Sequence, residues 1–164
     1  MFDFKPEPDL DTVERYRQLA DAADALTRGE ADGVANMANC AALLWEFLPD
    51  LNWAGFYRVV GGENGPELVL GPFVGRPACI RIPIGQGVCG AALQSAETQR
   101  VEDVHAFAGH IACDGASRSE LVVPIQREGA VVAVIDLDSP KPARFTPKDA
   151  EGLEMVAARI ADRI

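Results

Sequence analysis

Apolar residues in the first part of the chain recur every three or four positions, which is the spacing of amphipathic helices. From Asp11 to Thr27 this spacing predicts one helix, with Asp11 as its N-cap and its end near Gly29. A second helix is predicted from Val34 to Leu48, where Pro49 follows. The residues expected on the buried faces of the two helices are Val13, Tyr16, Ala20, Ala23 and Leu26, and then Val34, Met37, Ala41, Leu44, Trp45 and Leu48.

The middle of the chain is rich in aromatic and β-branched residues, which favour strands. Residues 52–60 and 67–70 flank a glycine-rich turn and predict a hairpin. Residues 121–126 and 130–137 flank a second short turn and predict another hairpin. Consecutive hairpins indicate a mainly antiparallel sheet.

The remaining segments predict shorter elements. A third strand is expected from Cys79 to Ile84 and a short helix from Val88 onward. Residues 98–118 predict a short strand followed by a long polar loop, and such loops are commonly functional. The chain closes with a helix that begins after the cap residue Thr146.

Helices therefore bracket a run of hairpin-connected strands, and this order predicts an α+β fold. A mainly antiparallel central sheet should carry the helices on its outer face. The length of the chain suits one domain over residues 1–164. Its N-terminal helices span about 9–48, the sheet and loops about 51–138, and the C-terminal helix about 146–164.

Charge and hydropathy exclude some classes of partner. The formal net charge of −10 and the lack of a Lys/Arg stripe argue against nucleic acid. No segment reaches the roughly 18 uninterrupted apolar residues of a membrane helix. The first six residues include an acid and a proline where a signal peptide needs a basic and then an apolar region. We therefore expect a cytoplasmic protein without a membrane partner.

Three cysteines between residues 79 and 113 indicate thiol chemistry. Cys79, Cys89 and Cys113 lie in its glycine-rich and acidic part. Cytosolic proteins rarely keep structural disulfides, so several cysteines in one such domain favour metal binding or redox catalysis. Cys40, in the second predicted helix, is expected to be a packing residue.

Zinc is the metal that these residue types would suggest. Cys79, Cys89, His105, His110 and Cys113 are all zinc-type ligands. Structural zinc sites usually supply ligands in close pairs, and here only His110 and Cys113 are that close. We therefore expect no metal, and expect the two histidines to orient the loop or tune Cys113.

Two pairs of residues have a spacing that leaves their role open. Asp136 and Asp138 alternate along a strand and so point to the same side of the sheet. They either enter a pocket or are solvated residues at the end of the strand. Trp53 and Tyr57 also share a face, either as core aromatics or as the wall of a binding site.

Motifs along nearly the whole chain carry a resemblance to a known family. The chain resembles the free methionine-(R)-sulfoxide reductases, which are built on a single GAF domain. The segments that carry the resemblance are Asn52-Trp53-Ala54-Gly55-Phe56-Tyr57, Leu70-Gly71-Pro72-Phe73, Gly75-Arg76-Pro77-Ala78-Cys79, Gly85-Gln86-Gly87-Val88-Cys89-Gly90, Asp103-Val104-His105, Gly109-His110-Ile111-Ala112-Cys113-Asp114, Ser117-Arg118-Ser119-Glu120 and Asp136-Leu137-Asp138-Ser139.

The resemblance implies catalytic roles for five residues. Cys113 would be the attacking cysteine and Cys79 the resolving cysteine, with Cys89 as an alternative disulfide partner or an accessory thiol. A thiolate attacks the sulfoxide sulfur, and a nearby acid must hydrogen-bond or protonate the departing oxygen. Glu120 and Asp138 are the expected acids. The resulting sulfenic acid condenses to a disulfide, which thioredoxin would reduce.

The resemblance also implies how the substrate is bound. Asp136 would pair with the ammonium group of free methionine sulfoxide, a group that peptide-bound methionine sulfoxide lacks. Trp53 and Tyr57 would form an aromatic wall at its methyl end. No metal or organic cofactor is expected besides the external thiol reductant, and the resemblance is compatible with a homodimer.

Two other functions compete with this one. GAF domains also act as small-ligand-binding modules, and the same cysteines could serve a thiol redox sensor without turnover. Repeated consumption of sulfoxide with a thiol donor distinguishes a reductase from both.

Overall fold

The computed structural model of the protein describes residues 4–63, 65–109 and 114–164. Within them, six strands form one sheet in the order β3-β2-β1-β6-β5-β4, and every neighbouring pair is antiparallel. The expected α+β fold with an antiparallel central sheet is confirmed. The strands are β1 (Trp53–Gly62), β2 (Gly65–Gly75), β3 (Arg81–Pro83), β4 (Gln99–Val101), β5 (Ser119–Arg127) and β6 (Ala130–Ser139).

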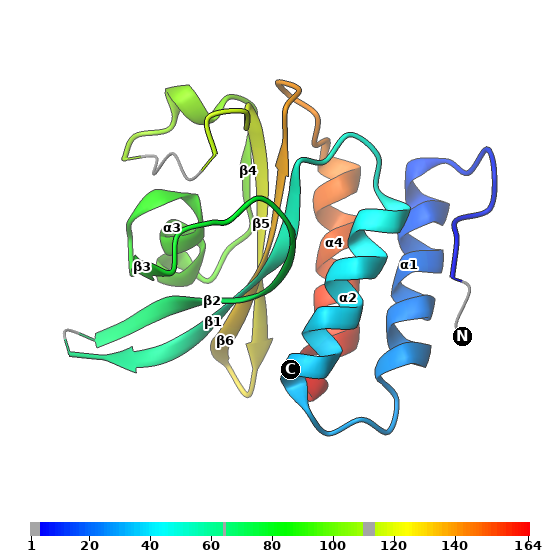
Figure 1. Cartoon of the computed structure of the whole chain (residues 1–164), viewed down its shortest axis with the longest axis horizontal. Helices are drawn as coiled ribbons and strands as arrows, with labels where there is room; N and C mark the ends of the chain where they lie inside the picture. Colours follow the sequence, from blue (N-terminus) through cyan, green and yellow to red (C-terminus); the bar gives the residue numbers. More distant parts are fainter. Residues whose placement is uncertain (1–3, 64, 110–113) are drawn as a thin grey trace.

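Helices cover the two faces of the sheet unequally (Figure 1). Three long helices lie on one face: α1 (Thr12–Thr27), α2 (Gly33–Phe47) and α4 (Pro147–Ile160). The short helix α3 (Gly87–Ser95) lies on the opposite face, together with the segments that link the shorter strands. Two single turns of 3₁₀ helix complete the described part, η1 (Val104–Ala106) and η2 (Ala161–Arg163). None of the described helices is long and apolar enough to cross a membrane.

Both predicted helix caps are confirmed. The Asp11 carboxylate accepts a hydrogen bond from the Glu14 N–H at 2.9 Å. At α4, the Thr146 side chain accepts from the Asp149 N–H at 3.3 Å and the Asp149 carboxylate accepts from the Thr146 N–H at 2.8 Å. This reciprocal arrangement satisfies backbone donors that a helix N-terminus leaves unpaired.

The sheet separates two apolar layers. The larger one fills the space between the sheet and helices α1, α2 and α4, and includes Phe56, Leu121 and Ile135. The smaller one lies beneath α3 and includes Trp53 and Tyr57. Alternation along the strands thus sends successive side chains into different layers, and the smaller layer borders the functional site.

Some predictions of buried helix faces were wrong. Val13, Val34 and Trp45 are 42%, 49% and 40% exposed. In α2 the buried face instead includes Cys40 and Phe47, which are 1% and 3% exposed. The helix is apolar around most of its circumference, and only the stripe that meets the sheet is covered. The buried position of Cys40 agrees with a packing role.

The strand boundaries also differ from those predicted. Strand β2 continues to Gly75, well beyond the predicted end at residue 70. Strand β3 spans only Arg81–Pro83, so Cys79 precedes it rather than beginning it. As an edge strand, β3 pairs with β2 alone and over a short stretch, which limits its length. Glu120 lies within β5, which begins earlier than predicted.

The contact between α1 and α4 depends on the lack of a side chain at Gly152. A Cβ atom there would overlap the ring of Tyr16, which is completely buried and donates a hydrogen bond to Asp149 Oδ1 at 3.2 Å. In an open helix, glycine to alanine stabilises by about 1 kcal/mol. Overpacking a core costs about 1–3 kcal/mol.

We therefore expect Gly152→Ala to lower the free energy of unfolding by about 1–2 kcal/mol in urea denaturation, because the overlap outweighs the helix propensity. Glu151→Ala, at the exposed neighbouring position, is the control and should change stability by less than about 0.5 kcal/mol. A stabilised Gly152→Ala protein would contradict the tight contact.

Candidate active site

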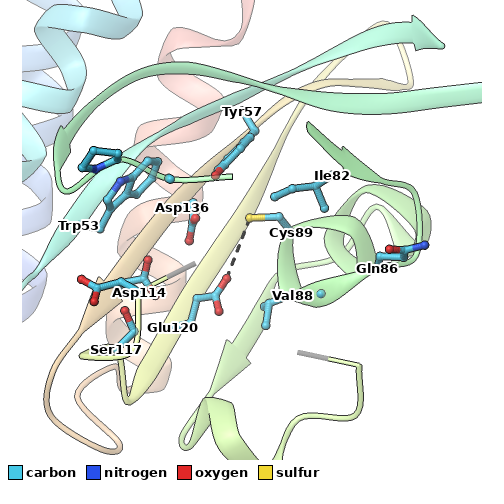
Figure 2. Close-up of a pocket in the computed structure, with 14 residues that line it drawn as sticks. Trp53, Tyr57, Ile82, Gln86, Val88, Cys89, Asp114, Ser117, Glu120 and Asp136 are labelled. Atoms are coloured by element: carbon cyan, nitrogen blue, oxygen red, sulfur yellow. Dashed lines mark hydrogen bonds between the residues drawn. The ribbon is translucent and has the colours of Figure 1, made fainter. Parts of the chain in front are cut away.

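A pocket lies between the sheet and α3, on the face opposite the three long helices (Figure 2). Its polar side consists of Glu120, Asp136 and Asp138 from β5 and β6, with Asp114 and Ser117 from the segment before β5. Its other walls come from β1, from Pro77 and Ala78, and from Gln86–Cys89 at the start of α3. Acidic and apolar surfaces therefore face each other across a small space.

The register of the central strands explains how the carboxyl groups meet. Across β1, β6 and β5, Trp53 is paired with Asp138, which is paired with Glu120. Residues paired across antiparallel strands point to the same face, so these three side chains form one row. Asp136 lies in the next row of that face, beside Gly55. The sequence left open whether Asp136 and Asp138 enter a pocket, and the structure places both there.

Burial raises the pKa of each of these carboxyl groups. The pKa of Glu120 is raised well above its usual value, first by burial and then by the charges of Asp136 and Asp138. The pKa of Asp136 is raised by burial and by Asp138. Burial raises the pKa of Asp138 to about 7, although a hydrogen bond with Ser117 opposes the rise. At neutral pH the cluster therefore contains at least one protonated carboxyl, which is what a general acid requires.

Cys89 faces the same carboxyl groups from α3. Its side chain is buried, and its Sγ donates a long hydrogen bond of 4.0 Å to Glu120 Oε1, drawn as the dashed line in Figure 2. Burial and the charges of Asp136 and Glu120 raise the pKa of this thiol well above its usual value. Thiolates, not thiols, are nucleophiles, so this environment makes Cys89 a poor attacking group.

One group of side chains has the geometry of a metal site. Among the described residues, ligand atoms of Cys89, Glu120 and Asp136 all lie within 4.8 Å of one another. This set shares only Cys89 with the five zinc-type ligands considered from the sequence. One thiol and two carboxyls could hold a divalent ion. The same groups suit a cationic organic ligand, and the expectation that no metal is needed stays a prediction.

The two aromatic residues expected to form a wall both line the pocket, and they belong to a stack of three rings. Trp53 stacks on Tyr57 with ring centroids 5.8 Å apart and on Phe73 with centroids 5.3 Å apart. A Cβ atom at Gly55 would lie 2.7 Å from the Trp53 ring, so a glycine there lets the stack form. Phe73 is not among the described residues that line the pocket, and it supports the Trp53 ring from a β2 segment that the sequence pattern did not predict as a strand.

The indole of Trp53 is also tied to the segment that carries Cys79. Its Nε1–H donates to the Arg76 carbonyl oxygen at 3.1 Å. Cys79 itself is half-buried against the smaller apolar layer and takes part in a disulfide. The free thiols among the described residues are Cys40 and Cys89.

Cys113 and His110 lie outside the described residues. His105 lies in η1, where its N–H donates to Asp103 Oδ1 at 3.1 Å. The proposed tuning of Cys113 by these histidines stays a prediction.

Three polar residues near the pocket were not predicted as site residues. Asn52 donates hydrogen bonds to Asp114 and Ser117, and the latter two line the pocket. All three occur in the motifs that resemble the reductase family, which is the signal that could have identified them. Single polar residues without periodic spacing carry no other recognisable pattern.

Comparison with known proteins agrees with this fold and site. The GAF domain model matches residues 17–164. Free methionine-R-sulfoxide reductase of Escherichia coli is 46% identical over 92% of this chain and 89% of its own length. The enzyme of the same name from Saccharomyces cerevisiae is 42% identical over 92% of this chain and 86% of its own.

Solved structures extend the likeness to three dimensions. The crystal structure of free methionine-R-sulfoxide reductase from Neisseria meningitidis in complex with its substrate matches with a TM-score of 0.92 and 40% identity, over 99% of this chain and 95% of that chain. The chain therefore belongs to the GAF domain family and, within it, to the free methionine-R-sulfoxide reductases.

The raised pKa of Asp138 predicts a specific dependence of stability on pH. The native carboxyl keeps its proton between the ordinary value of 3.8 and about 7, whereas the unfolded one does not. The free energy of unfolding should therefore fall as pH rises through this window. One proton corresponds to a slope of about 1.4 kcal/mol per pH unit.

Urea denaturation between about pH 5 and 8 should show this fall in the wild type and a flatter profile in Asp138→Asn. Asp50→Asn is the control, because a hydrogen bond from Lys141 lowers the pKa of Asp50 instead. An unchanged slope in Asp138→Asn would contradict a protonated Asp138.

Proposed function

We propose that this protein reduces free L-methionine (R)-S-oxide to L-methionine with a thiol as reductant. The strongest support is the pocket itself, in which Glu120, Asp136 and Asp138 face the Trp53 wall in a member of this reductase family. A zwitterionic amino acid with a polar sulfoxide and an apolar methyl group matches these surfaces.

Asp136 is the proposed partner of the substrate's ammonium group. Its side chain is 6% exposed, and Oδ1 has no hydrogen-bond partner among the described residues. A buried carboxylate oxygen without a partner is costly, and a bound ammonium would supply both charge and hydrogen bonds. The stacked rings of Trp53 and Tyr57 are the proposed contact for the methyl end.

The chemical step transfers oxygen from the substrate to a cysteine. The Cys113 thiolate attacks the sulfoxide sulfur while Glu120, whose pKa favours the protonated form, donates a proton to the oxygen. This attack forms a transient bond between the two sulfurs. The protonated oxygen then moves to Cys113 Sγ: the substrate S–O bond and the bond between the sulfurs break, the Cys113 S–O bond forms, methionine leaves, and Cys113 becomes a sulfenic acid. Asp138 shares the pocket with Glu120 and is the proposed second proton carrier.

Recycling then requires two further thiol reactions. The Cys79 thiol attacks the Cys113 sulfenic acid, which forms a disulfide and releases water. A dithiol donor such as thioredoxin reduces this disulfide, and the reaction thus belongs in a reducing compartment, which we take to be the cytoplasm. The raised pKa of the free Cys89 thiol favours Cys79 over Cys89 as the resolving residue. A homodimer stays a prediction.

The function is tested by methionine release from the free R sulfoxide, the free S sulfoxide and the N-acetylated R sulfoxide, with thioredoxin, its reductase and NADPH present. We expect turnover of the free R epimer alone, because acetylation removes the charge that Asp136 would bind. No turnover with any of the three would instead favour a redox sensor or a ligand-binding module.

Two carboxyl-to-amide variants serve as a matched pair in this assay. Asp136→Asn should chiefly raise KM, by about tenfold or more, because it removes one charge-assisted contact. Glu120→Gln should chiefly lower kcat, by about 10²–10⁴-fold, because an amide cannot donate the proton. Equal effects of both variants on both parameters would contradict the separate roles.

The two cysteine roles predict different single-turnover results. Cys113→Ser should form no methionine, whereas Cys79→Ser should form one equivalent and then stop, because its sulfenic acid cannot close the disulfide. Quantifying methionine without a reductant distinguishes the two. Cys40→Ser, at the buried packing position, is the control and should retain full turnover. Sulfoxide reduction by Cys113→Ser would refute the assigned nucleophile.

A further inference from the structure

Asn52 holds two residues of the segment that follows Cys113. Its Nδ2 donates to Asp114 Oδ2 at 3.2 Å and to Ser117 Oγ at 3.0 Å. Asp114 comes directly after Cys113 in the sequence. A carboxylate at Asp114 accepts but does not donate, which fixes the orientation of the Asn52 amide.

The same end of β1 also holds the segment that precedes Cys79. The next residue, Trp53, donates from Nε1 to the Arg76 carbonyl oxygen at 3.1 Å. The Arg76 guanidinium lies 3.8 Å from Asp114 Oδ1. Asn52 and Trp53 therefore connect one strand end to both cysteine-bearing segments, and Asp114 and Arg76 connect those segments to each other.

The backbone of Asn52 is itself fixed against the acidic strand. Its N–H donates to the Asp138 carbonyl oxygen at 3.0 Å. Beyond Asp114, a backbone bond of 3.2 Å from the Ser117 N–H to the Asp114 carbonyl closes a turn. The segment after Cys113 is thus anchored, through Asn52, to the central sheet.

We propose that Asn52 is a positioning residue that sets the place of Cys113 relative to the carboxyl groups and to Cys79. The proposal rests on the proposed function for the roles of the two cysteines. Asn52 is not among the described residues that line the pocket, and its side chain donates to Asp114 and Ser117, so it acts through these two residues.

Small displacements at such a position have large kinetic effects. Reaction requires the thiolate within about 3–3.5 Å of the sulfoxide sulfur, and a misplacement of about 1 Å can cost about 10²-fold in rate. Disulfide closure needs the two cysteine Cα atoms within roughly 7 Å of each other. Loss of the Asn52 contacts would affect both steps.

The chain offers a matched control at Asn36. This buried asparagine also donates two hydrogen bonds from Nδ2, to the carbonyl oxygens of Glu30 and Arg163, and its Oδ1 also lacks a partner among the described residues. It lies in α2, on the other face of the sheet. Asn36→Ala therefore removes the same chemical group without touching the pocket.

The first test compares single-turnover methionine formation in Asn52→Ala and Asn36→Ala, well below the Tm of either variant. We expect a loss of about 10–100-fold in Asn52→Ala with a smaller change in KM, and less than about twofold in Asn36→Ala. A wild-type rate in Asn52→Ala, or equal losses in both variants, would overturn the proposal.

A second variant tests the hydrogen bond itself. Asn52→Asp should form methionine slowly, because the new carboxylate would face the Asp114 carboxylate, to which the Asn52 amide donates a hydrogen bond in the wild type. The double variant Asn52→Asp/Asp114→Asn reverses donor and acceptor and should recover most of the rate. Failure of the double variant to exceed Asn52→Asp, with both proteins folded, would contradict a role for this contact.

A third measurement does not need the sulfoxide. In glutathione buffers, the protein dithiol and oxidised glutathione exchange with the protein disulfide and two glutathione thiols, and the equilibrium constant for forming the protein disulfide reports how well Cys79 and Cys113 are aligned. We expect it to fall at least about tenfold in Asn52→Ala and to stay within about twofold in Asn36→Ala. If the wild type does not reduce sulfoxide but Asn52→Ala still lowers this equilibrium constant, the proposed reductase function is refuted and the positioning role is upheld. If the two variants have the same equilibrium constant, the positioning role is refuted.

Discussion

The burial of three carboxyl groups on one face of the central sheet is the constraint around which this molecule is organised. Glu120, Asp136 and Asp138 lose hydration there, and each responds with a raised pKa. Such a cluster is unfavourable unless its members share protons or meet a cation. The fold tolerates this cluster for two reasons. Strand β6 is hydrogen-bonded to β1 on one side and to β5 on the other, and the opposite face of the sheet packs against three helices.

The two faces of the sheet therefore have different tasks. The face under α1, α2 and α4 is apolar and supplies most of the buried surface. The face under α3 gives up part of its apolar packing to acidic side chains and a pocket. The stability that the larger apolar layer supplies offsets the unfavourable burial of acidic groups on the other face, which is a common relation between a scaffold and its active site.

Much of this arrangement could be predicted from the sequence, and the remainder depends on long-range pairing. The caps at Asp11 and Thr146 and both hairpins follow from local patterns. Alternation placed Asp136 and Asp138 on one side of their strand, but only the register with β1 and β5 decides which face that is. Exposure of Val34 likewise depends on which stripe of α2 is covered, and the helical period of apolar residues does not determine this in a helix that is apolar on most sides.

The pairing of β1 with β6 has a consequence for how the protein is made. These neighbours lie at opposite ends of the strand-forming sequence, so the centre of the sheet closes through contacts of large sequence separation. Such contacts form late and slow the folding of a chain. A ribosome-bound chain that still lacks β6 has neither Asp136 nor Asp138 beside Trp53. The pocket therefore cannot assemble piecemeal, and its reactive chemistry arises only when nearly the whole chain has folded together.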